Sequence, residues 1–326
     1  MGGVRFLIFN CSLFSSLCVL CGLCGQIQQK PAAWGSDHVG RAIPEFVSGD
    51  ECLFCHRSDI GPNWPRDRHN RTVREPERGS PAMADLRKAH LEHAGQVKYV
   101  LGGEQRLRFL KVSPDYGKLE VLSTQWQPAR AGKPAHLIEK GRPDWDTKTF
   151  ADSCAGCHAT AVNVETRAFS AVSLECYTCH GDVDLKHSKD AKLALLAKKR
   201  NDPARVVTSI CAQCHLREGK SRSSGLPYAN NFVAGDNLFR DYDVDFSPEH
   251  LKELNPGDRH VFENVRDVVL LGKEDVTCLS CHNVHKQSSK KHHLVEESDY
   301  CLSCHEATGS KKKLKSYEVH SRTCEY

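Results

Sequence analysis

The sequence is poor in the residues that usually build a hydrophobic core. Aromatic residues make up 7% and hydrophobic residues 39% of the 326 residues, so side chains alone would give a chain of this length a thin core. The charges nearly balance, with 45 Lys and Arg against 41 Asp and Glu. Because this balance lacks the basic excess that favours nucleic acid, we expect no nucleic-acid partner.

Long apolar runs are also scarce, and the one that is present lies at the N-terminus. Residues 6–25 are apolar and follow the basic residue Arg5, a pattern typical of a secretory signal. We therefore expect residues 1–25 to be a signal peptide and the protein to be exported, to the periplasm or the extracellular face of the cytoplasmic membrane. Leu23 fits the small-residue rule for cleavage near Gly25 poorly, so an uncleaved anchor, the one expected membrane attachment, is the alternative.

Cysteine, in contrast, is abundant and regularly spaced. Twelve of the 17 cysteines form C-x-x-C pairs, and a histidine directly follows each of the six pairs. Histidine makes up only 18 of 326 residues, so six such coincidences are far beyond chance. In chain order, motif 1 contains Cys52, Cys55 and His56; motif 2 Cys154, Cys157 and His158; motif 3 Cys176, Cys179 and His180; motif 4 Cys211, Cys214 and His215; motif 5 Cys278, Cys281 and His282; motif 6 Cys301, Cys304 and His305.

The C-x-x-C-H pattern is the attachment signature of c-type haem. Two cysteines about one helical turn apart can each form a thioether to a vinyl group of one porphyrin, and the adjacent histidine ligates the iron. Paired C-x-x-C also occurs in zinc sites, but zinc does not explain a histidine after all six pairs. The sequence therefore predicts six haem c groups, which also supply the apolar bulk that the side chains lack.

The remaining cysteines leave no pair for a disulfide in the mature chain. Four of them lie in the N-terminal apolar run, and Cys324 stands alone. The sequence ends at Tyr326, where a further Cys and His would complete a seventh motif starting at Cys324. We expect Cys324 to be a free thiol, and a seventh haem only if the natural chain is truncated after Tyr326.

Methionine is nearly absent, since Met83 is the only one besides Met1. A methionine as second axial ligand raises the reduction potential of a haem, whereas histidine leaves it lower. Methionine-ligated haems are therefore nearly excluded, and six bis-histidine haems need six of the twelve histidines outside the motifs.

Position in the chain ranks these twelve histidines. His285 follows His282 by three residues and His187 follows His180 by seven, so both can reach a nearby haem. His69, His260 and His320 lie in polar loops or helix starts where an uncoordinated histidine has no evident task. The sixth ligand is open among His90, His93, His136 and His293, of which we take His93, while His38, His250 and His292 are expected to lie at the surface.

A stretch without haem motifs interrupts the chain between His56 and Cys154. Its β-type runs at 97–101, 106–112 and 118–122 are broken by glycine and proline turns, which predicts a small antiparallel β element near residues 95–125. Elsewhere the pattern predicts short helices and extensive loops packed on haems, so the expected fold class is mainly α. The expected division is 1–25 leader, 26–93 N-terminal region with the first haem, 94–150 β-containing insert and 151–326 five-haem domain.

Several of these features occur in an order that resembles a known family. Trp64 with His69, the 99–102 strand, Gly181 after motif 3 and the Cys-His-Asn-Val-His run of motif 5 are similar to the multihaem cytochromes related to cytochrome c-554, over residues 45–326. The resemblance implies stacked bis-histidine haems in a periplasmic or extracellular electron-transfer protein. It supports His69, His187, His260, His285 and His320 as distal ligands. The chain departs from the Cys-His-Gly-Pro-Gly common in that family by having Asp182 and Val183.

These observations favour an electron carrier over an enzyme. No C-x-x-C-Lys variant marks a special haem, and the surplus of histidine argues against an open iron. The expected partners are redox proteins, and the basic clusters at 189–200, 290–291 and 311–315 either dock an acidic one or only aid solubility. Two alternatives stay open: an oxidoreductase of nitrogen or sulfur oxyanions with one open haem, and a polymerising extracellular cytochrome wire.

Overall fold

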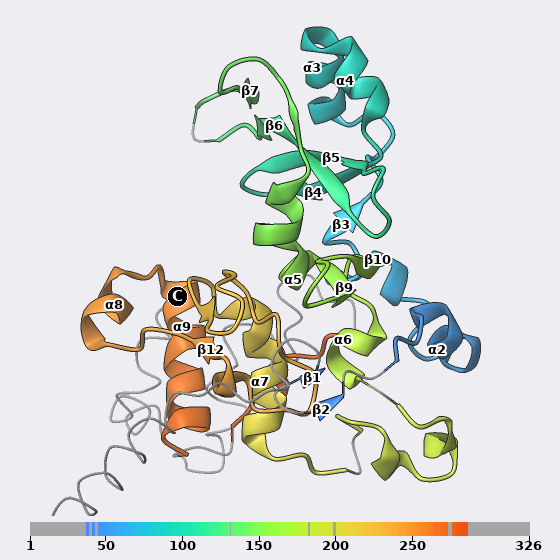
Figure 1. The fold of residues 1–326 in the computed structure, drawn as a ribbon, viewed down its shortest axis with the longest axis vertical. Coiled ribbons are helices and arrows are strands. Elements are labelled where there is room, and N and C mark those ends of the chain that lie inside the picture. The colour runs from blue at the N-terminus through green and yellow to red at the C-terminus, as the bar shows by residue number, and fades with distance from the viewer. Residues whose placement is uncertain are drawn as a thin grey trace, which may run out of the picture.

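The computed structural model describes residues 37–38, 41–42, 45–130, 132–181, 183–197, 200–272 and 276–285. The expected leader, all of motif 6 and the candidate ligand His320 lie outside these residues. A β-sheet lobe occupies one end of the molecule, the helix of motif 2 lies directly beneath the sheet, and the helices of motifs 3 and 4 lie toward the other end (Figure 1). None of the helices in the described ranges combines the length and the apolar character needed to cross a bilayer.

The β-sheet lobe is built on an antiparallel sheet of six strands. The order is β3-β4-β5-β6-β7, and β8 pairs with β6 beside β7. Gly102 turns the chain between β4 and β5 at a φ of +82°, and a Cβ there would lie 2.4 Å from the carbonyl oxygen of Arg106, so only glycine fits. The strands are β3 (Val73–Arg74), β4 (Tyr99–Gly102), β5 (Leu107–Val112), β6 (Leu119–Gln127), β7 (His136–Ile138) and β8 (Trp145–Asp146).

This sheet has a side-chain core on each face. Val121 belongs to one core and its neighbour Leu122 to the other, because successive strand residues point to opposite faces. On the Leu122 side lie α3 (Pro81–Ala89) and α4 (Leu91–Gln96). Leu86 of α3 is fully buried there. On the Val121 side lies the start of motif 2, including the fully buried Ala155. The sheet therefore supports motif 2 directly.

The prediction of a mainly α fold is wrong. The sheet reaches from Val73 to Asp146, well beyond the expected 95–125. Its strands fold on apolar side chains of their own, so this region does not need haem as its core. Three further antiparallel pairs add to the strand content: β1 (Asp37–His38) with β2 (Arg41–Ala42), β9 (Ala159–Val162) with β10 (Phe169–Val172), and β11 (Lys220–Ser221) with β12 (Tyr242–Asp243).

The other end of the molecule contains a separate helical core. Helix α7 (Ala204–His215) packs on α9 (Pro256–Val265), with Ala212 and Phe262 buried between them. Proline begins α9, and the side chain of Asn255 accepts a hydrogen bond from the backbone of Asp258 at 3.1 Å, which satisfies the first turn. The remaining elements here are α8 (Pro248–Glu253), the 3₁₀ turn η5 (Leu238–Arg240) and the π-helical turn η6 (Arg266–Leu270).

Candidate haem-binding centre

Each of the five described motifs lies on a short helix or at the end of one. Within a helix, residues three apart share one face, so both cysteines of each motif can reach the same side of a porphyrin. Motif 1 ends α2 (Gly49–His56) and motif 4 ends α7. Motif 2 covers the end of a π-helical turn, η2 (Phe150–Cys154), and α5 (Ala155–His158); motif 3 is α6 (Cys176–His180); motif 5 is α10 (Cys278–Cys281) with His282 as its C-cap.

Three motif histidines lie opposite a histidine from another part of the chain. The rings of His56 and His187 have centroids 6.0 Å apart and planes 16° apart. The rings of His180 and His285 are 5.9 Å and 18° apart. The rings of motif 4's His215 and of His69 are 6.3 Å apart with planes at 69°.

These separations fit an iron between the two rings. Two iron–nitrogen bonds of about 2.0 Å, plus about 1.1 Å from each nitrogen to its ring centre, add up to roughly 6.2 Å. Directly stacked imidazoles would lie much closer together. The spacing therefore matches two axial ligands on opposite faces of a haem.

Hydrogen bonds at the other ring nitrogen support the same geometry. Nδ1 of His187 donates to the carbonyl of Asp184 at 2.8 Å, and Nδ1 of His180 donates to that of Leu195 at 2.7 Å. Carboxylates lie beside two more of the six histidines, since Asp59 is a hydrogen-bond partner of Nδ1 of His56 at 3.2 Å, and Asp67 lies at ion-pair distance, 3.3 Å, from Nδ1 of His69. Such partners fix the tautomer and leave Nε2 as the ligating nitrogen.

Desolvation keeps several of these imidazoles neutral. Burial lowers the pKa of His158 to about 4. The pKa of His215 is lowered to about 4 as well, first by desolvation and then by the nearby His69. Burial also lowers the pKa values of His180 and His285. Neutral imidazole is the form that ligates iron, so the side chains of these residues suit the group that the motifs imply.

The motifs also contact one another through their cysteines. Interaction with the thiol of Cys176 lowers the pKa of Cys52 to about 7, and helix α2 contacts α6, so motif 1 meets motif 3. The same contact joins Cys157 with Cys214 and Cys211 with Cys278, so motif 4 meets motifs 2 and 5. The ten described motif cysteines are free of disulfides. In the haem-bound protein these sulfur atoms would be thioether sulfurs at the porphyrin edges.

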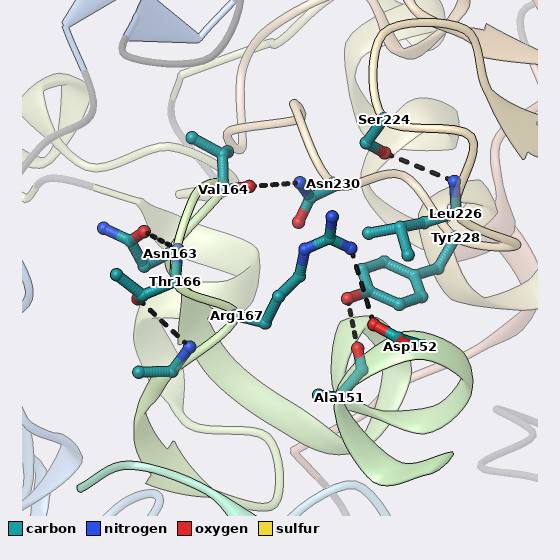
Figure 2. Close-up of polar contacts among 11 residues, drawn as sticks. Ala151, Asp152, Asn163, Val164, Thr166, Arg167, Ser224, Leu226, Tyr228 and Asn230 are labelled. Atoms are coloured by element: carbon teal, nitrogen blue, oxygen red, sulfur yellow. Dashed lines mark hydrogen bonds and ion pairs between the residues drawn. The ribbon is translucent and has the colours of Figure 1, made fainter. Parts of the chain in front are cut away.

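Two buried tyrosines, Tyr228 and Tyr242, hold motifs 2 and 4, and reasoning from the sequence missed both. The ring of Tyr228 covers motif 2 so closely that a Cβ on Gly156 would lie 2.0 Å from it, and its hydroxyl donates to the carbonyl of Ala151 at 2.6 Å (Figure 2). Tyr242 likewise covers Gly219, and its hydroxyl donates to the carbonyl of Leu216 at 2.9 Å. The glycine inside motif 2 is the one sequence signal that a bulky ring lies there.

Figure 2 also shows the polar contacts around Tyr228. Arg167 extends between Tyr228 and Asn230 and lies 3.6 Å from Asp152. Asn230 donates to the carbonyl of Val164 at 3.4 Å. These contacts tie the β9–β10 connection to the segment that holds Tyr228, and they fix the ring against motif 2.

The structure separates the other candidate ligands from these pairs. His93 lies on α4 in the β-sheet lobe, 6.1 Å from His90 and 6.3 Å from Trp145 between ring centroids, and its role as a distal ligand stays a prediction. His90 contacts Glu139, and Nδ1 of His136 lies 3.1 Å from the carbonyl of Pro134. His260 lies on α9, where its side chain is exposed. Its role as a ligand stays a prediction, as do those of His320 and motif 6.

Comparisons with known proteins give one distant likeness. No family model matches the sequence, and no curated protein matches it at a significant level. Among solved structures, the chain is similar to the undecaheme cytochrome from the S-layer of Carboxydothermus ferrireducens, with a TM-score of 0.44 and 18% identity, over 82% of this chain and 44% of that chain. The chain thus spans less than half the length of that protein. A likeness this distant carries no argument about function, so the proposals below rest on the residues of this chain.

Proposed function

We propose that the protein is a multihaem c-type cytochrome that carries electrons. The observation that supports this most strongly is the set of three histidine pairs, each with a motif histidine on one side and a histidine from elsewhere in the chain on the other. Their ring separations of 5.9 to 6.3 Å are those of axial ligands. The proposed ligand pairs are His56 with His187, His180 with His285, and His215 with His69.

The residues of the chain attach, orient and tune the cofactors. The motif cysteines form the thioethers, and the paired imidazoles fill both axial positions, while the haems supply reversible one-electron chemistry. With both positions filled, the irons bind no substrate, which suits transfer rather than catalysis. The hydrogen bonds at Nδ1 of His56, His180 and His187 hold these imidazole planes in place and make their Nε2 atoms more basic.

Histidine on both sides places the haems at low reduction potential. Met83 is buried in the core between the sheet and α3, so its thioether is committed to packing. In the three proposed pairs, a histidine takes the axial position that a methionine could otherwise fill. Low-potential haems suit a respiratory chain outside the cytoplasm, with redox proteins as donor and acceptor, and the apolar 6–25 segment supports export.

One observation favours an enzymatic role as a second candidate. His158 of motif 2 is deeply desolvated, and among the described residues no ring contact pairs it with another histidine. A haem with one open axial position could reduce or oxidise a small oxyanion. A high-spin ferric signal that becomes low-spin when imidazole is added, and that is missing from C154A/C157A, which cannot attach haem at motif 2, supports this candidate.

Haem counting and electron paramagnetic resonance test the proposal together. The full chain is produced in a host that exports proteins and attaches haem c, and covalent haem is counted by pyridine haemochrome and by intact mass. We expect six haems per chain and low-spin ferric signals from the three proposed pairs. A protein that carries zinc, or no covalent haem, under these conditions contradicts the proposal.

A further inference from the structure

The helix of motif 4 touches the helices of three other motifs. Helix α7 contacts α5, α6 and α10, which carry motifs 2, 3 and 5, whereas α2 with motif 1 contacts α6. We infer that the motif 4 haem is a branch point, through which electrons pass between the motif 1 and 3 haems on one side and the motif 2 and 5 haems on the other. This inference rests on the proposed function.

Specific atoms make each of the three contacts of motif 4. Sγ of Cys214 lies 3.8 Å from the carbonyl oxygen of Gly156 in motif 2, and its thiol meets Cys157. The side-chain amide of Gln213 donates to the carbonyl of Thr178, inside motif 3, at 3.3 Å. The thiol of Cys211 meets Cys278 of motif 5. Both cysteines and an intervening residue of motif 4 therefore point at different neighbours.

Motif 1 has a simpler environment. Its cysteine Cys52 meets Cys176 of motif 3, and the backbone N–H of Gly49 donates to the side chain of Glu175 at 2.7 Å. Phe54, between its two cysteines, is 84% exposed. Among the described motifs, motif 1 thus forms the end of the path, and motif 3 joins it to motif 4.

Contacting cysteines bring cofactor edges together, because each sulfur is bonded directly to a porphyrin vinyl carbon. Tunnelling favours the shortest gaps, so electrons follow these contacts, and between motifs 3 and 4 they cross where Gln213 meets the carbonyl of Thr178. Each transfer moves one electron, with one iron oxidised from ferrous to ferric and its neighbour reduced from ferric to ferrous, and no bond forms or breaks. The electron enters from an external one-electron donor and leaves to an external acceptor, which in the test are dithionite and ferricyanide.

A ligand exchange at motif 4 tests the branch. In H69M, a thioether replaces the distal imidazole and raises the potential of that haem, so it stays reduced while the low-potential haems titrate. A reduced neighbour carries one positive charge less, so each adjacent haem becomes harder to reduce and its midpoint potential falls. H187M makes the same change at motif 1 and is the matched control.

The readout is the number of other haems whose midpoint potential falls. Potentiometric titration with optical and electron paramagnetic resonance detection measures it. We expect at least three for H69M and fewer for H187M, because among the described motifs the helix of motif 1 contacts that of motif 3. Equal numbers in the two variants, or fewer than three for H69M, overturn the branch. Both variants must first show six covalent haems. A protein without covalent haem contradicts the proposed function itself. Variants that carry all six haems but show equal numbers of shifted haems contradict only the branch.

A second variant covers the case in which H69M does not fold. H69G is produced with imidazole in the medium, which fills the distal position, and the folded protein is then transferred to tetrahydrothiophene as a thioether ligand. The imidazole-loaded form serves as the reference for the same titration. At least three shifted neighbours after the exchange again support the branch, and fewer overturn it.

Discussion

The imidazole of His187 faces that of His56 at 6.0 Å between ring centroids, with the two planes only 16° apart. These residues come from α2 and from the 3₁₀ turn η3 (Leu185–Ser188), which are distant in the sequence. A pair of parallel imidazoles at this distance leaves room for one iron between them. The contact therefore turns two otherwise unremarkable surface segments into the two sides of one site.

Removing the distal imidazole should expose one iron. In H187A we expect one haem to change from low spin to high spin, because water or no ligand replaces the imidazole, while the haem count stays the same. Electron paramagnetic resonance at low temperature measures this change. H93A is the matched control, since His93 lies in the β-sheet lobe, and a high-spin signal in H93A instead of H187A would contradict the pairing.

The carboxylate beside His56 should lower the potential of the motif 1 haem. Asp59 lies 3.2 Å from Nδ1 of His56, and its charge makes the imidazole a stronger donor to ferric iron. D59N should therefore raise one midpoint potential, by a modest amount because both groups are partly exposed. Potentiometric titration checks this, with D115N, at an exposed carboxylate beside Lys118, as the control that leaves all potentials in place.

Gly156 should be intolerant of any side chain while Tyr228 is present. A Cβ there would lie 2.0 Å from the tyrosine ring, so G156A should lower the free energy of unfolding by about 1–3 kcal/mol through overpacking. In a Y228A background the same change should cost much less, because the ring is gone. Denaturant unfolding of the four proteins measures this double-mutant cycle, and an undiminished cost in the Y228A background speaks against direct packing.

The β-sheet lobe should be stabilised by its own side chains. Leu122 is fully buried between the sheet and α3, so L122A should cost about 2–5 kcal/mol of unfolding free energy without changing the low-spin haem spectra. V112A, at a residue 57% exposed, should cost little. Thermal unfolding followed by far-ultraviolet circular dichroism gives both values. A lobe that depends on haem for its core would instead show little difference between the two variants.

The sequence could identify the attachment motifs because their chemistry requires fixed local spacing. It could also place β4, β5 and β6, since their runs alternate between turn signals. It underestimated the sheet because β3, β7 and β8 are two or three residues long, too short to leave a periodic pattern. The mainly α prediction failed for this reason.

The spacing of the histidines in the sequence does not show which of them face each other in the fold. His285 is close in sequence to His282, yet the fold brings it to His180 of motif 3. His69 follows motif 1 but faces His215 of motif 4. In both cases the partner depends on how helices that are distant in the sequence pack together. The periodicity of the sequence does not show that packing. Tyr228 and Tyr242 escaped notice for the same reason.

Because each histidine pair joins distant parts of the chain, the pairs also determine the order in which the haems acquire their second axial ligand. If the chain leaves the cytoplasm N-terminus first, His56 emerges long before His187, and His180 long before His285. Irons attached early at motifs 1 and 3 must wait for their second ligand, whereas motif 4 finds His69 already outside when its own cysteines arrive. The first haem to reach its final ligation is then the one at motif 1, once His187 has emerged, followed by the one at motif 4 and last by the one at motif 3.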